Sequence, residues 1–164
     1  MMKSITDRRA FIKAFDTKFN AVKNAHPALD TFLKEFPSRT NIYIIGGFLR
    51  SVNDRRHKTN DLDIIVSSSD NILQKAVRTS FRRVKHNRIG GFKIKSRRLI
   101  IDIWNLKHHY GFKRQVGKTE LESIAKSCFY NFDSIVFNVK TKKFCVRYYN
   151  RCLRTSTLDL VTKI

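Results

Sequence analysis

Apolar residues recur at spacings of three and four near the start of the chain, which is the period of an amphipathic helix. The residues that follow this period are Phe11, Ala14, Phe15, Phe19 and Val22. Proline is well placed in the first turn of a helix, so we expect His26 and Pro27 to separate two helices. Residues 1–37 are therefore predicted to form an N-terminal helical pair.

The pattern changes after residue 40, where short apolar runs rich in β-branched residues indicate buried strands. The first run, residues 41–45, ends at Gly46 and Gly47, and the second, residues 62–66, follows Asp61. Further strands are expected at 81–85, 91–95, 98–105, 134–140 and 143–148. Helices are expected at 48–53, 70–80 and 118–127, with Asp70 as the cap of the second.

This order of elements predicts an α+β fold with a mixed β-sheet that carries helices mainly on one face. A chain of 164 residues with 41% hydrophobic residues suits a single domain over residues 1–164. Such a domain can bury a core without disulfide support. We expect its core to span residues 41–148.

The three cysteines are odd in number and form no C-x-x-C pair, which favours free thiols in a reducing compartment. No apolar run approaches the roughly 20 residues that a membrane helix needs. The N-terminus also lacks the apolar core of a secretion signal. These features predict a cytoplasmic protein without a membrane partner.

The charge is strongly positive, because 34 Lys and Arg stand against 13 Asp and Glu and give a net charge of +21. Such a surface binds polyanions by releasing their counterions, so nucleic acid is the first candidate partner and an anionic membrane surface the second. A solubility effect would give the same totals. The densest basic segments contain Arg82, Arg83, Lys85, Arg88, Lys93, Lys95, Arg97 and Arg98. On strands, alternate members would form a stripe that grips the phosphate backbone.

Two carboxylates stand two residues apart in Asp61-Leu62-Asp63. Side chains alternate along a strand, so Asp61 and Asp63 are expected on one face while Leu62 enters the core. Neighbouring carboxylates repel each other unless a cation lies between them, and hard oxygen ligands suit magnesium. The alternative is a pair of solvated aspartates at the end of a strand.

A third carboxylate, Asp102, interrupts the otherwise apolar run of residues 99–104. An unpaired charge inside such a strand is very costly, so Asp102 needs a partner. The structural alternative is an ion pair with a basic residue. The functional one is a metal shared with Asp61 and Asp63, and three aspartates could hold two magnesium ions.

Gly46 and Gly47 follow a strand and open a helical segment that contains Arg50. Glycines let backbone N–H groups approach phosphate oxygens closely, and Arg50 is placed to contact the same phosphates. Many turns between a strand and a helix contain such a pair, so its position relative to the aspartates matters more than the pair alone.

The order of these features resembles the nucleotidyltransferase superfamily, and within it the head domain of CCA-adding enzymes and bacterial poly(A) polymerases. That family has a G-G-x-V-R-D segment followed closely by D-x-D. Here residues 46–51 read Gly-Gly-Phe-Leu-Arg-Ser, and Asp61-Leu62-Asp63 follows. The resemblance covers residues 41–148. It implies nucleotide binding by Gly46, Gly47 and Arg50 and metal binding by Asp61 and Asp63, with Asp102 matching the third carboxylate by order and strand context.

A later segment, residues 130–138, is similar to the family stretch that ends F-T-I-N-A-L-A-Y-N. In the family this stretch lies beside the nucleotide. The resemblance therefore implies that Asn131 and Asp133 contact the sugar or the phosphates. A simple turn before a strand is the alternative for both residues.

Two departures limit what the resemblance implies. The family's Asp after the Arg is Ser51 here, and its R-R-D segment is replaced by Ser127-Cys128-Phe129. In CCA-adding enzymes, helices after the head choose the base and grip the tRNA, whereas only residues 149–164 remain here. A partner protein that supplies RNA-binding domains is accordingly one expectation.

The expected function is that of a magnesium-dependent nucleotidyltransferase of the EC 2.7.7 type. It would transfer a nucleoside monophosphate from an NTP, with ATP and CTP favoured, to an RNA 3′ end, with tRNA as the favoured acceptor. One alternative is a stand-alone toxin, antitoxin or signalling-nucleotide synthase that modifies tRNA, a partner protein or a nucleotide. The other is a non-catalytic RNA-binding module.

Overall fold

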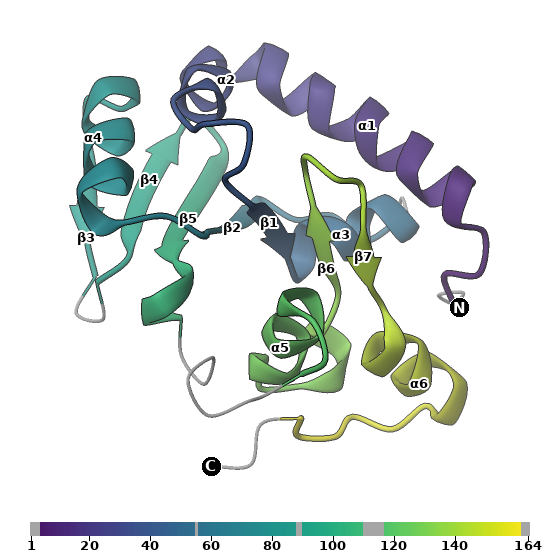
Figure 1. The fold of residues 1–164 in the computed structure, drawn as a ribbon. Helices are drawn as coiled ribbons and strands as arrows, with labels where there is room; N and C mark the ends of the chain where they lie inside the picture. Colours follow the sequence, from purple (N-terminus) through teal and green to yellow (C-terminus); the bar gives the residue numbers. More distant parts are fainter. Residues whose placement is uncertain (1–3, 55, 88–89, 110–116, 162–164) are drawn as a thin grey trace.

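The computed structural model of the chain describes residues 4–54, 56–87, 90–109 and 117–161. A seven-stranded mixed sheet runs through it in the order β3-β4-β5-β2-β1-β6-β7 (Figure 1). The strands are β1 (Ile42–Ile45), β2 (Asp61–Val66), β3 (Lys85–His86), β4 (Phe92–Ser96), β5 (Leu99–Asn105), β6 (Val136–Asn138) and β7 (Phe144–Cys145). Strands β2 and β5 pair in parallel, and the other pairs are antiparallel.

Six α-helices lie within the described ranges: α1 (Arg8–Ala25), α2 (Pro27–Lys34), α3 (Gly47–Asn53), α4 (Asp70–Ser80), α5 (Glu120–Ser127) and α6 (Arg147–Thr155). Two short 3-10 helices, η1 (Leu106–His108) and η3 (Asn131–Asp133), connect elements. None of the helices in these ranges has the length and apolarity that crossing a membrane requires.

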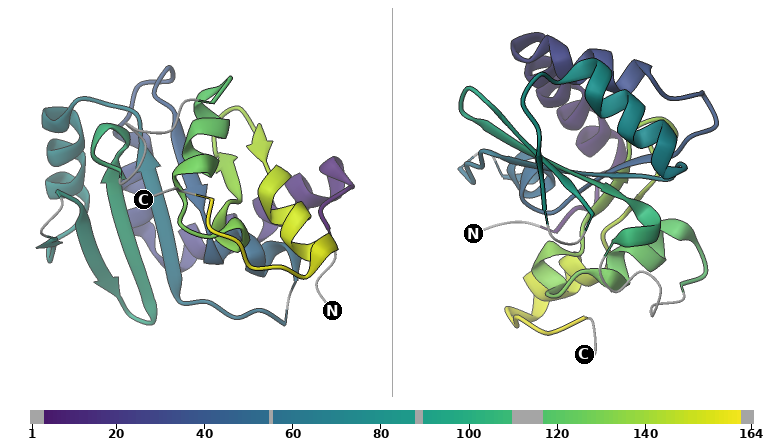
Figure 2. Two further views of the ribbon diagram at one scale, coloured as in Figure 1. Left: turned by 90° about the horizontal axis from the view of Figure 1, so that it is seen from below. Right: turned by 90° about the vertical axis from the view of Figure 1, so that its left-hand side faces the viewer.

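Helices α1, α2 and α4 cover one face of the sheet, and α5 and α6 lie on the other side (Figure 2, right). The apolar stripe of α1 buries Phe11, Phe15 and Phe19 against this first face. Phe15 is fully buried and stacks on Phe137 of β6 with 3.9 Å between ring centroids. The first face is therefore closed by aromatic packing, which leaves the opposite face for chemistry.

A second, smaller cluster lies on the opposite face, where Ile124 and Ala125 of α5 pack with Tyr43, Ile65 and Val136. This cluster covers the sheet around β1 and β6. Toward β4 and β3 the same face carries charged side chains, and Lys85 and Lys95 are exposed there. The part of this face over β3 and β4 thus remains accessible.

The predicted α+β class, the N-terminal helical pair and the bias of helices to one face are confirmed. Several strands are shorter than predicted: the segment expected at 81–85 pairs only at Lys85 and His86, and the one expected at 134–140 only at Val136–Asn138. The strand expected at 143–148 ends at Cys145, and helix α6 follows where no helix was predicted.

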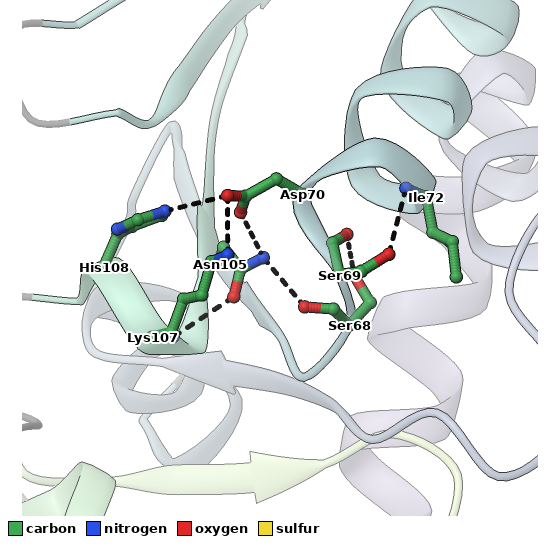
Figure 3. A network of polar contacts seen from close by, with 7 residues as sticks. All are labelled: Ser68, Ser69, Asp70, Ile72, Asn105, Lys107 and His108. Carbon is green, nitrogen blue, oxygen red and sulfur yellow. Dashed lines mark hydrogen bonds and ion pairs between the residues drawn. The ribbon is translucent and has the colours of Figure 1, made fainter.

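A polar network joins the start of α4 to the end of β5 (Figure 3). Ser69, not Asp70, caps α4, since its side chain accepts a hydrogen bond from the Ile72 N–H. Asp70 in the first turn instead accepts from Asn105 Nδ2 at 2.8 Å and pairs with Lys107 at 2.6 Å. This network fixes the carboxyl ends of β2 and β5 beside α4.

Candidate active site

The turn after β1 requires glycine at its first position. Gly46 has φ of 67° and ψ of −130°, a conformation that side-chain-bearing residues rarely adopt. A Cβ atom at Gly46 would lie 3.7 Å from Asp63 Oδ2. At Gly47 it would lie 3.2 Å from Thr59 Oγ1. The turn at Gly46 therefore brings the backbone close to Asp63.

Asp63 and Asp102 lie side by side in the sheet, because they are register partners on the parallel strands β2 and β5. Asp61 precedes Asp63 by two residues and therefore points to the same face. The register pairs extend this line across the sheet from Lys85 through Lys93, Asp102 and Asp63 to Ile45. We call this line the carboxylate row.

Burial and neighbouring carboxylates together raise the pKa of Asp63 to about 6. Burial is the largest cause, and repulsion from Asp102, Asp61 and Asp133 adds to it, while Lys93 acts in the opposite direction. A carboxyl in this environment favours a proton or a cation.

Asp102 forms an ion pair with Lys93, which is the structural alternative that the sequence allowed for this residue. Lys93 Nζ lies 3.1 Å from Asp102 Oδ2. The other oxygen, Oδ1, is buried and has no hydrogen-bond partner among the described residues. The ion pair accounts for one oxygen of Asp102 and leaves the second available to a ligand.

The aspartates carry the hard oxygen donors that magnesium prefers, and the unpartnered Oδ1 of Asp102 fits such a group. In the present side-chain conformations, no group of three or more His, Cys, Asp or Glu side chains within the described ranges is arranged to hold a metal ion. The chemistry of the donor set fits a divalent cation, and metal ligation by these three residues stays a prediction.

Arg50 projects from α3 toward the segment before β6. Its guanidinium forms an ion pair with Asp133 and lies over the ring of Phe132, 4.6 Å from the centroid. Its Nε is buried and has no hydrogen-bond partner among the residues described. Two predicted nucleotide contacts, Arg50 and Asp133, are thus in direct contact with each other.

A cavity of about 490 Å³ lies beside the carboxylate row. It is lined by Ile45, Gly46, Gly47, Arg50, Thr59, Asp61, Asp63, Trp104, His109, Ser127, Cys128, Phe129, Tyr130 and Asp133. The predicted residues Gly46, Gly47, Arg50, Asp61, Asp63 and Asp133 are among them. The structure therefore brings most of the predicted site together around one cavity.

Sequence reasoning missed the aromatic part of this lining. Trp104 follows Asp102 by two residues on β5, so strand alternation could have placed it on the same face. Phe129 and Tyr130 carry no such signal, because they lie outside the strands, in the segment between α5 and η3.

Asn131 does not line the cavity. It is buried, and its Nδ2 donates to the Thr157 carbonyl at 2.9 Å. Its backbone N–H donates to the Asp159 carbonyl at 2.9 Å. Asn131 therefore anchors the segment after α6, and its contact with a nucleotide stays a prediction.

The predicted basic stripe is largely exposed, at Arg82, Arg83, Lys85, Lys95, Arg97 and Arg98. Lys93 differs, because it is half-buried against Asp102. Arg88 lies outside the described residues. Nucleic-acid binding by this set stays a prediction, with Lys93 already engaged at the site.

No protein-family model matches the chain, and no curated protein matches it in sequence. Solved structures do match its fold. A CCA-adding enzyme in complex with ATP matches with a TM-score of 0.61 at 13% identity, over 99% of this chain and 37% of that one. The complex with CTP matches with a TM-score of 0.62 at 15% identity, over 94% and 36%.

The CCA-adding enzyme of Thermotoga maritima in complex with tRNA matches with a TM-score of 0.59 at 16% identity, over 99% of this chain and 37% of that one. The chain thus spans about a third of the length of the solved proteins it matches. At these identities the match is one of fold. The chain shares its fold with part of the CCA-adding enzymes, as the order of its motifs predicts.

Proposed function

We propose that this protein is a magnesium-dependent nucleotidyltransferase that transfers a nucleoside monophosphate from an NTP to the 3′ end of an RNA, with tRNA as the favoured acceptor. The observation that carries the proposal is the carboxylate row beside a cavity that the Gly46–Gly47 turn and Arg50 also line. The solved proteins of the same fold were captured with ATP, CTP and tRNA, which supports these ligand classes here.

In the proposed reaction the 3′ hydroxyl attacks the α-phosphate. A bond forms between this oxygen and phosphorus, the bond to the β-phosphate oxygen breaks, and pyrophosphate leaves. The hydroxyl proton passes to solvent, and Asp102 would contribute through the cation that it helps to hold, since Lys93 holds Oδ2 and leaves Oδ1 for that cation. Lys93 is thereby a positioning residue for Asp102.

Arg50 is proposed to face the triphosphate. A guanidinium binds phosphate oxygens in a fixed planar geometry, and Asp133 together with Phe132 orients it before the nucleotide arrives. Asp61, Asp63 and Asp102 would hold the divalent cation, which when bound neutralises triphosphate charge and acidifies the attacking hydroxyl.

The RNA is proposed to approach over β3 and β4. Lys85 continues the carboxylate row, and Lys95 lies in the adjacent row that contains Ile100 and Asp61. Cations at these positions attract phosphates without reading sequence, and they would place the acceptor strand next to Asp102.

The direct test incubates the protein with NTPs labelled at the α-phosphate, Mg²⁺ and total RNA. We expect labelled RNA, and we expect periodate oxidation of the RNA 3′ ends to abolish it. The variants Asp61→Asn and Asp63→Asn should lose at least 99% of the activity, in keeping with about 3 kcal/mol or more from electrostatic stabilisation of the transition state.

Asp30→Asn on α2 is the matched control, because it removes an aspartate on the opposite face and should keep full activity. Label on RNA that survives both Asp61→Asn and Asp63→Asn would overturn the assigned site. Label that appears on protein, or on RNA with oxidised ends, would overturn the proposed acceptor.

A further inference from the structure

Three aromatic side chains, Trp104, Phe129 and Tyr130, line the same cavity as Asp61 and Asp63. Trp104 is the register partner of Ile65, so it lies on the face of the carboxylate row and one row beyond it. Positions two residues apart on a strand are separated by about 7 Å. In a nucleotide, the sugar separates the α-phosphate from the base by a similar distance. Trp104 therefore gives the cavity an aromatic side chain next to its carboxylates.

The ring of Trp104 has a fixed support. A Cβ atom at Gly91 would lie 2.6 Å from Trp104 Cε3 and 2.7 Å from Cζ3. The indole can pack this closely only because position 91 has no side chain. Trp104 is thus held in place on the sheet without a ligand, which lowers the entropic cost of binding one.

Phe129 and Tyr130 are each 44% exposed although both are large and aromatic. Their backbone is nevertheless fixed, since the Val161 N–H donates to the Phe129 carbonyl at 2.8 Å and Tyr130 forms an isolated β-bridge with Leu160. Asn131 secures the same pairing through Thr157. Exposed aromatic side chains on a fixed backbone beside a cavity provide a stacking surface.

Two of the polar side chains in this lining, Ser127 and His109, are engaged within the protein. Ser127 Oγ donates to the Ile124 carbonyl at 2.7 Å, and His109 Nδ1 lies 3.0 Å from Ser127 Oγ. Stacking tolerates every base, because each base has a π-face, whereas hydrogen bonds to base edges discriminate between bases.

We propose that Trp104, Phe129 and Tyr130 form an aromatic wall that binds the base of the NTP by stacking and accepts all four bases. This inference rests on the proposed function, in that it takes the cavity to be the NTP site. It adds that this part of the chain binds the base without selecting it.

The sole tryptophan of the chain is Trp104, so intrinsic fluorescence reports on the aromatic wall directly. We would titrate the protein with ATP, GTP, CTP, UTP and inorganic tripolyphosphate in Mg²⁺ buffer. All four NTPs should quench the emission, with dissociation constants within about tenfold of one another. Tripolyphosphate should bind about tenfold more weakly, by the usual contribution of one stacked base.

Two variants test the wall itself. Phe129→Ala, at an exposed position, should weaken NTP binding about fivefold and leave tripolyphosphate binding unchanged. Trp104→Leu should weaken ATP binding about tenfold, measured by equilibrium dialysis with labelled ATP. Ile72→Ala on α4 is the matched control, because Ile72 is equally exposed at 43% and lies outside the cavity lining.

The outcomes separate this inference from the proposed function. Absence of binding by every NTP would overturn both. NTPs that bind no more tightly than tripolyphosphate, or one NTP preferred by a hundredfold or more, would overturn the aromatic wall alone and leave the transfer reaction standing.

Discussion

Asp63 is buried beside other carboxylates, and this burial, followed by repulsion from Asp102, Asp61 and Asp133, raises its pKa from 3.8 to about 6. A carboxyl with a raised pKa binds more protons when folded than when unfolded. The free energy of unfolding therefore falls as the pH rises from about 4 to 6, and the full loss is reached above pH 6. We expect Asp63→Asn to raise the free energy of unfolding by about 1–3 kcal/mol at pH 7.5 in EDTA.

Urea unfolding between pH 4 and 8 measures this effect. The stability that Asp63→Asn gains over the wild type should become smaller toward pH 4. Asp30→Asn is the control, because Asp30 is paired with Lys34 and its loss should give no gain at neutral pH. Added Mg²⁺ should stabilise the wild type and not Asp63→Asn, since a ligand stabilises the state that binds it. A loss of stability for Asp63→Asn in EDTA would contradict the raised pKa.

Gly91 supports Trp104 by having no side chain. In Gly91→Ala the new Cβ would lie 2.6 Å from the Trp104 ring and 2.5 Å from Asn87 Nδ2, so the ring must shift. We expect a loss of about 1–3 kcal/mol in the free energy of unfolding, as for other overpacked sites. A change in the emission maximum of Trp104 should accompany it.

A double-mutant cycle isolates this contact. In a Trp104→Leu background the same glycine substitution should cost less, because the smaller side chain leaves room for the Cβ. Equal costs in the two backgrounds would show that Gly91 does not act through Trp104.

The helix α4 and the strand β5 are joined through Asp70. Its carboxylate lies 2.8 Å from Asn105 Nδ2, 2.6 Å from Lys107 Nζ and 3.2 Å from His108 Nε2. Asp70 also favours the first turn of α4 electrostatically. We expect Asp70→Ala to lower the free energy of unfolding by about 1–2 kcal/mol at pH 7.

The pKa of Asp70 is lowered, chiefly by its hydrogen bond with Lys107. A lowered pKa stabilises the fold above the unfolded value of 3.8 and ceases to do so as the pH falls below it. The difference between wild type and Asp70→Ala should therefore become smaller in acid, where the ionic contribution of Asp70 is lost. Asn71→Ala, at the next position of α4, is the control and should have little effect at either pH.

Elements with a strong local pattern were predictable, whereas their partners in the sheet were not. Alternation along residues 61–63 places both aspartates on one face, and the β4–β5 hairpin would also have paired Lys93 with Asp102 by counting outward from its turn. The parallel pairing of β2 with β5 depends on contacts between residues almost forty positions apart. No local pattern specifies that register.

Helix α6 shows how a local signal can be overlooked. Its buried residues, Tyr149 and Cys152, stand three positions apart, which fits a helix. The aromatic pair at 148–149 fits a strand equally well, and the preceding strand β7 ends at Cys145, just before α6 begins at Arg147. Short apolar runs of this kind are ambiguous until their tertiary contacts are known.

The charges of the molecule are distributed unevenly over its two faces. The net charge is +21, yet Asp61, Asp63 and Asp102 gather on the face that also carries exposed lysines of β3 and β4. Helix α4 on the other face carries exposed cations as well, including Lys75 and Arg78. Net charge alone therefore does not identify the face that binds RNA. Variants that remove the same charge from each face do identify it.

We expect the double variant Lys85→Gln/Lys95→Gln to weaken RNA binding and to lower the salt dependence of log K by about 1–2, because each lost phosphate contact removes about one released counterion. Lys75→Gln/Arg78→Gln removes the same charge from α4 and should leave the slope unchanged. Filter binding over 50–300 mM KCl in EDTA measures both. If the two pairs weaken binding equally, the polyanion responds to overall charge and not to the face of the carboxylate row, and the proposed approach of the RNA over β3 and β4 is wrong.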